Sequence, residues 1–284
     1  LSASDSRVDL DRMVLSKVGL SRNLGTVYSV ASAGRGQDFE SRLGTFVERF
    51  CDLKDNGSGL NTLCQVATPV GDTGFNRDVD YTRLLDQGPT INADLTNDNR
   101  TQDETNVIML GHFLYGHRQP KKRISSSELE NSPGQSELYK EYRSVFARRA
   151  AAQNSYNTLA AMKMAGSGAS DQYMKEVLKQ IGIANGDESK YLGAKNTTEA
   201  EVKSSYNAQM NLLTKQIFQD PSFYVNLMDS KANVKRTSAA IQGVGLMQDR
   251  DIYKSMERSE MLLAILVELE ARKQVSTNQG GANQ

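Results

Sequence analysis

The chain has 284 residues, enough for one large domain or two ordinary domains with a buried core. Lysine plus arginine and aspartate plus glutamate number 34 each, so the surface has no net charge that would attract nucleic acid or an anionic membrane. Tryptophan is absent, and the longest apolar run, 261–267, is far shorter than the ~20 residues that cross a bilayer. The composition favours a polar helical protein over a nucleic-acid-binding protein or an enzyme with a deep apolar pocket.

Residues 1–119 form the first predicted region, which is rich in loops and also contains helices. Apolar residues are dense enough for a helix that begins near Asp9, and a joint rich in small residues follows at 31–36. Phe39, Phe46 and Phe50 share one face at helical spacing, which predicts an amphipathic helix ending near Cys51.

The only two cysteines, Cys51 and Cys64, flank a turn-prone polar segment. Their spacing predicts a disulfide hairpin, which would stabilise the fold by ~3 kcal/mol in the chain-entropy model. Such a bond requires an oxidising compartment such as the periplasm. The alternative is a pair of buried thiols in a cytosolic protein.

The segment 68–119 has little helical periodicity before its last third. Val79 and Tyr81 alternate with polar neighbours, and 90–95 alternates in the same way, which predicts short strands. The apolar run 107–115 fits either a strand or a helix, and we favour a helix. The polarity of 68–106 leads us to expect a loop surface that projects toward a partner or a channel lumen.

No metal or cofactor site is expected from the motifs. His112 and His117, the only histidines, would point in different directions on a helix and make a poor chelating pair. No catalytic or nucleotide-binding fingerprint occurs, since Gly243 and Gly245 lie in a helical pattern without the preceding strand that phosphate binding requires. We therefore expect a protein that is not an enzyme.

Residues 120–136 are polar and charged and contain prolines, which predicts a linker. Residues 137–284 are the predicted helical domain. Within it, periodic apolar residues predict helices over 138–159, 174–181 and 202–217. The predicted fold class is therefore mainly α, with a multi-helix C-terminal region and a loop-rich N-terminal half that contains short strands and a disulfide hairpin.

The C-terminal helices carry the predicted interaction surface. Asp220 and Pro221 are a typical helix start, and a break is expected near Asp229. A long second run then repeats apolar residues at close to helical spacing, and such a face must be buried against something. The residues that we expect to form packing or oligomer surfaces are Phe223, Tyr224, Leu227, Met247, Leu262 and Leu266.

Two glycines interrupt the long run. Gly243 and Gly245 lie beside Ala239 and Ala240 and form a patch of small residues. Each glycine costs about 1 kcal/mol of helix propensity relative to alanine, so the patch has to serve a purpose. It either lets another helix approach closely or lets this helix bend, and we favour the bend.

The stretch from Asp220 to Lys273 resembles the C-terminal region of accessory proteins of type IV secretion and conjugation systems. The matching features are NLMD at 226–229, ANV at 232–234, LMQDR at 246–250 and a final helix that contains RSE at 258–260. The stretch is similar to the IcmX-like periplasmic component of the Dot/Icm (type IVB) apparatus. The match covers about a fifth of the chain, and it includes no catalytic residues.

The resemblance implies an exported structural component of the cell envelope that contributes to a multimeric channel complex. Expected partners are further copies of the chain and other envelope proteins of the secretion system, such as a polytopic DotA-like membrane protein; no nucleic acid and no membrane span of its own are expected. Since the chain begins at Leu1, we expect either a processed product or part of a longer one. The alternatives are a minor-pilin-like adhesin of a type IV secretion system and a helical cell-wall hydrolase.

Overall fold

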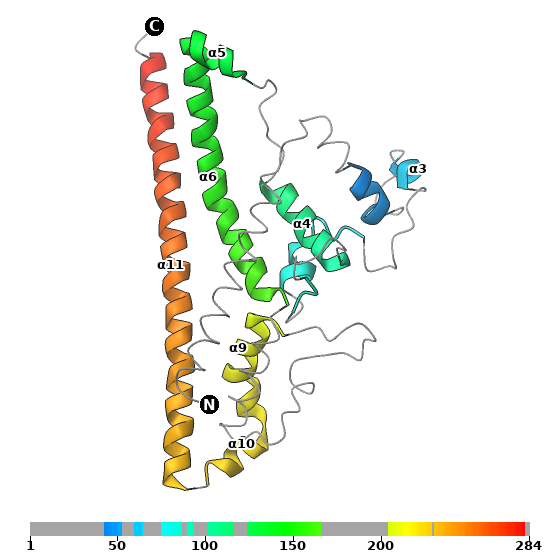
Figure 1. The fold of residues 1–284 in the computed structure, drawn as a ribbon, viewed down its shortest axis with the longest axis vertical. Helices are drawn as coiled ribbons and strands as arrows, with labels where there is room; N and C mark the ends of the chain where they lie inside the picture. Colours follow the sequence, from blue (N-terminus) through cyan, green and yellow to red (C-terminus); the bar gives the residue numbers. More distant parts are fainter. Residues whose placement is uncertain are drawn as a thin grey trace. The chain divides into compact units, whose positions relative to one another are not determined.

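The computed structural model describes residues 43–52, 60–64, 75–86, 90–93, 101–115, 124–165, 204–228 and 230–281. Of these residues 83% are helical, which confirms the mainly α fold class (Figure 1). The described part contains no strand. The predicted helices near Asp9 and over 174–181, and His117, lie outside the described residues.

Contacts divide the chain into two compact units. Unit 1 comprises Leu1–Arg123 and Tyr156–Thr237, and unit 2 comprises Ile124–Ser155 and Ser238–Gln284. This grouping differs from the predicted division into 1–119, 120–136 and 137–284. Sequence patterns locate elements along the chain, whereas a unit depends on which distant elements pack together.

Unit 1 contains a helix over 43–49 and the short helix α3 (Leu60–Cys64), which are connected by the Cys51–Cys64 disulfide. The turn of π-helix η1 (Thr82–Asp86) and the helix α4 (Gln102–Tyr115) follow. Later in the chain, unit 1 also contains the end of α6 (Pro133–Lys163), α9 (Tyr206–Thr214), the 3-10 helix η3 (Gln216–Gln219) and α10 (Pro221–Asn226).

The helix α4 begins with a capping box that the threonine and glutamate spacing encodes. The Thr101 hydroxyl accepts a hydrogen bond from the Glu104 backbone N–H at 3.1 Å, and the Glu104 carboxylate accepts one from the Thr101 N–H at 2.9 Å. All residues from Glu104 to Gly111 are buried. A helix that is covered on every side is a core element.

The main core of unit 1 forms where α4, η1, residues 91–93 and the end of α6 pack together. The Tyr156 hydroxyl donates a hydrogen bond to the Val107 carbonyl at 2.8 Å, which fixes the end of α6 against the buried α4. The buried members of this core are Leu84, Leu85, Ile91, Ala93, Val107, Ile108, Leu110, Tyr156, Ala160, Ala161 and Met164.

The strand prediction for the segment 68–106 was wrong in its described parts. Residues 75–79 form a turn and Tyr81 begins a helical turn, so no strand forms there. Ile91 makes a single parallel bridge to Met164 in place of a strand. Leu84 and Leu85 are buried in the core, whereas Val79 and Tyr81 of the same segment are 59% and 40% exposed. The alternation at 90–93 is present, since Ile91 and Ala93 are buried and Asn92 is half-buried, but a strand also needs a neighbour with which it pairs along its length, and among the described residues only one bridge forms here.

Unit 2 contains α5 (Ser126–Asn131), residues 133–155 of α6 (Pro133–Lys163) and residues 238–281 of α11 (Lys231–Gly281). Within the predicted linker 120–136, the residues from α5 onward are helical, apart from Ser132. Ser125 caps α5 in a complete capping box with Glu128, and the proline at 133 stands at the start of α6, where a missing N–H costs nothing.

Candidate interaction surface

Phe223 is a packing residue of unit 1. Its side chain is 4% exposed, and its ring makes edge-to-face contacts with Phe218 at 5.2 Å and Tyr224 at 5.4 Å between ring centroids. Asp220 begins this helix as predicted, because its carboxylate accepts a hydrogen bond from the Ser222 N–H at 2.8 Å.

Tyr224 and Leu227 lie on the exterior of the same short helix, with 52% and 38% of their surfaces exposed. The Tyr224 hydroxyl donates a hydrogen bond to the Phe218 carbonyl at 2.9 Å, which holds the ring in place. The structure thus separates one buried anchor, Phe223, from two side chains that a partner can reach.

The helix α11 runs without interruption for 51 residues through the predicted glycine patch (Figure 1). A Cβ atom added at Gly243 or at Gly245 would meet nothing within 4 Å. In the described part of the chain, no other element packs closely against these glycines.

The single apolar face that the sequence predicted on α11 is in fact two faces. Met247 and Leu262 are half-buried, as are Ile265 and Leu269 on the same side of the helix. Leu266 belongs to a different side, on which six large side chains are between 53% and 69% exposed. We call this set the exposed face of α11; its members are Ile252, Tyr253, Met256, Leu263, Leu266 and Val267.

A third side of α11 carries ion pairs. Lys254 lies 2.6 Å from Glu257, and a pair between Arg272 and Glu268 lies further along the helix. The hydrogen bond from Lys254 lowers the pKa of Glu257. Lys254 and Arg272 lie about 170° around the helix axis from the centre of the exposed face, whereas Glu257 and Glu268 lie about 110° and 130° from it, closer to its edge. The charged side meets the exposed face at Tyr253, because Lys254 Nζ lies 5.7 Å from the centre of the Tyr253 ring.

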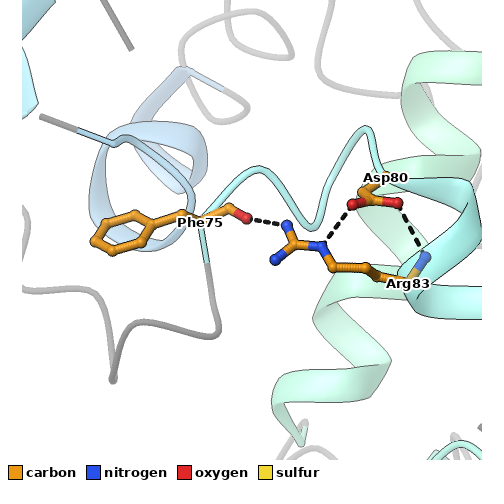
Figure 2. Close-up of polar contacts among 3 residues, drawn as sticks. All are labelled: Phe75, Asp80 and Arg83. Carbon is orange, nitrogen blue, oxygen red and sulfur yellow. Dashed lines mark hydrogen bonds and ion pairs between the residues drawn. The ribbon is translucent and has the colours of Figure 1, made fainter. Parts of the chain in front are cut away.

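Polar contacts of unit 1 gather in the turn before η1. The Asp80 carboxylate accepts hydrogen bonds from the Arg83 backbone N–H at 2.9 Å and from Arg83 Nε at 2.5 Å, and the same guanidinium donates to the Phe75 carbonyl (Figure 2). The hydrogen bond from the Arg83 backbone is the largest cause that lowers the pKa of Asp80. The Asn76 N–H donates to the Phe50 carbonyl at 3.0 Å, so this turn is tied to the chain beside Cys51.

Asp78, in the same turn, is a buried carboxyl group that the sequence did not single out. It is 2% exposed, and its Oδ1 atom has no hydrogen-bond partner. Burial raises its pKa to about 6. Nothing in the pattern NRDVD distinguishes this aspartate from its exposed neighbours, since burial depends on the packing of distant residues.

Cys51 and Cys64 form the predicted disulfide, with their Cα atoms 5.4 Å apart. Among the described residues, no group of three or more His, Cys, Asp and Glu side chains is placed to hold a metal ion. Within the same ranges, no helix has the length and apolar character needed to cross a membrane. Comparison of the chain with protein families, curated sequences and solved structures found no match.

Proposed function

We propose that this protein is a structural component of a type IV secretion or conjugation apparatus in the cell envelope, where it contributes to a multimeric channel complex. Its role is assembly, with no catalytic step. The partners are other envelope proteins of the apparatus, among them a polytopic DotA-like membrane protein.

The exposed face of α11 is the observation that carries this proposal. Proteins that work alone in water rarely leave large apolar side chains exposed in a continuous patch, and such patches mark interaction sites. The patch lies within the stretch that resembles secretion-system proteins, which connects the surface to the proposed role. Tyr224 and Leu227 add a second apolar surface in the same stretch.

The disulfide supports the proposed location. Disulfide bonds persist in oxidising compartments such as the periplasm and are rare in the cytosol. The Cys51–Cys64 bond joins the helix at 43–49 to α3, so it fastens local structure in unit 1. We therefore propose that the chain is exported and functions in the periplasm.

Cell fractionation followed by purification of the native complex tests this function. The full-length protein is expected in the periplasmic or envelope fraction, and after detergent extraction it should copurify with other envelope proteins as a multimer whose mass is measured by light scattering. The variant Leu266→Glu should lose copurified partners while retaining its helix content. Met261→Glu is the matched control, because Met261 is equally exposed on another side of the same helix.

Two outcomes would replace this proposal. Release of the protein to the cell surface or medium, without an envelope complex, would favour the minor-pilin-like adhesin. Hydrolysis of peptidoglycan by the purified protein would favour the cell-wall hydrolase. A cytosolic location with reduced cysteines would contradict all three envelope functions.

A further inference from the structure

We propose that the exposed face of α11 is a helix-to-helix interface between two copies of this chain. This inference rests on the proposed assembly function, and it deepens that function by naming the partner and the residues. The face consists of Ile252, Tyr253, Met256, Leu263, Leu266 and Val267.

The position of these residues on the helix makes the face continuous. At about 100° of rotation per residue, the six side chains fall within a stripe roughly 140° wide that runs from residue 252 to residue 267. Only Ser259 and Glu260 interrupt it. The Ser259 hydroxyl donates a hydrogen bond to the Ser255 carbonyl at 3.0 Å, which satisfies its donor within the helix. A second helix that lies along the stripe therefore covers a hydroxyl group whose hydrogen bond is already made within α11.

The area of the face is sufficient for a dimer. Six side chains that are 53% to 69% exposed offer on the order of 100 Å² each, or about 600 Å² per copy. Pairing two such faces would bury about 1,200 Å² in total, which is the lower end of the range for specific interfaces.

The charge pattern favours another copy of the chain over an anionic lipid surface. Between residues 252 and 267 no lysine or arginine lies within the stripe, whereas helices that lie on membranes carry basic residues beside their apolar side. The charged residue beside the stripe at its Tyr253 edge is the acidic Glu257, which pairs with Lys254 further around the helix. Binding energy at this face must therefore come from apolar contact with a similarly apolar surface.

The order of residues in the stripe also makes it self-complementary. Apolar residues occupy both ends, at 252–256 and 263–267, and Ser259 and Glu260 lie between them; Glu260 is exposed and lies about 50° from the centre line, near one edge of the stripe, so pairing along the centre leaves its carboxylate in water. When two copies pair about a two-fold axis, each residue of the patch meets the same patch of the partner. Both parallel and antiparallel pairing centred near Ser259 match apolar ends with apolar ends.

Analytical ultracentrifugation of the purified full-length chain tests the interface. We expect a dimer, and we expect Met256→Glu to raise its dissociation constant by on the order of 10- to 100-fold. Met261→Glu is the matched control: Met256 and Met261 are 64% and 59% exposed, but Met261 points about 140° away. A monomer across the accessible concentration range, or equal weakening by both substitutions, would overturn the inference.

Crosslinking with a short bis-maleimide adds a second readout, because the native cysteines are joined to each other and do not react. Parallel pairing should crosslink Ile252→Cys with itself. Antiparallel pairing should crosslink a mixture of Ile252→Cys and Leu266→Cys but not Ile252→Cys alone, since the two positions are about 21 Å apart along the helix. Either pattern supports the interface, and absence of both overturns it.

The test keeps this inference separate from the proposed function. A dimer from a protein that fractionates with the cytosol would support the interface and contradict the envelope role. A monomer that still copurifies with envelope proteins would support the role and assign the face to another protein. Binding of that monomer to anionic phospholipid vesicles, lost in Met256→Glu, would overturn the inference in favour of a lipid surface.

Discussion

Truncation of Leu110 should destabilise unit 1 more than truncation of Leu114, the other leucine of α4. Leu110 is 2% exposed in the middle of α4, which is buried on every side over 104–111. Leucine-to-alanine substitutions in cores cost about 2–5 kcal/mol, from lost burial and from the cavity that remains. Because α4 is held in place by its capping box and by the Tyr156 hydrogen bond to Val107, the surroundings cannot collapse into the cavity. We therefore expect Leu110→Ala to lower the free energy of unfolding by about 3 kcal/mol.

Hydrogen exchange of the peptide over 102–115 measures this effect within unit 1. A loss of about 3 kcal/mol should speed exchange of the α4 amides by on the order of 100-fold. Leu114 provides the control, because it lies one turn further along α4 and is 50% exposed. We expect Leu114→Ala to speed exchange by less than about tenfold. Equal rates for the two variants would show that α4 is not the buried helix of this core.

Three further predictions concern the disulfide, the glycines and the buried carboxyl. Replacing Cys51 and Cys64 together by serine should lower the free energy of unfolding by about 3 kcal/mol, measured by urea denaturation, and an unchanged midpoint would mean that the bond does not restrain the unfolded chain. Gly243→Ala with Gly245→Ala should raise the thermal stability of α11 in circular dichroism by about 1 kcal/mol per site, since an added Cβ meets nothing within 4 Å; destabilisation would indicate close packing there. The pKa of Asp78 is raised from 3.8 to about 6, so the protonated form is favoured by folding: its stabilisation is fully present below pH 3.8 and is lost as the pH rises through about 6. Asp78→Asn should therefore stabilise the protein at pH 8 by about 1–3 kcal/mol and flatten the decline between pH 4 and 6, whereas an unchanged stability profile would show that the carboxyl is solvated.

Local signals in the sequence located most of the described helices. Asp220 with Pro221 marked the start of α10, and the periodic apolar residues predicted both α6 and α11, because caps and helical spacing act over a single turn. The capping boxes at Thr101 and Ser125 follow the same rule and were readable from a threonine or serine three residues before glutamate. The box at Ser125 indicates that a helix begins within the segment 120–136.

The interaction residues were only partly predictable, since periodicity shows that a side chain belongs to an apolar face without showing what covers the face. Phe223 proved to be a buried anchor, whereas Tyr224 and Leu266 are exposed. On α11 the apolar residues fit one broad repeat in sequence, and the half-buried and exposed faces differ only by what lies against them. That distinction separates residues that hold the fold together from residues that are available to a partner.

The sequence alone determined the helical class, the pairing of Cys51 with Cys64 and the presence of a long C-terminal helix, because each depends on residue types at short, fixed spacings. Only the tertiary structure decided that the polar segment around Leu84 and Ile91 belongs to the core, that Asp78 is buried, and that α11 has one face covered by its own chain and another exposed. Burial arises from contacts between residues that are far apart in sequence, and no local pattern contains that information.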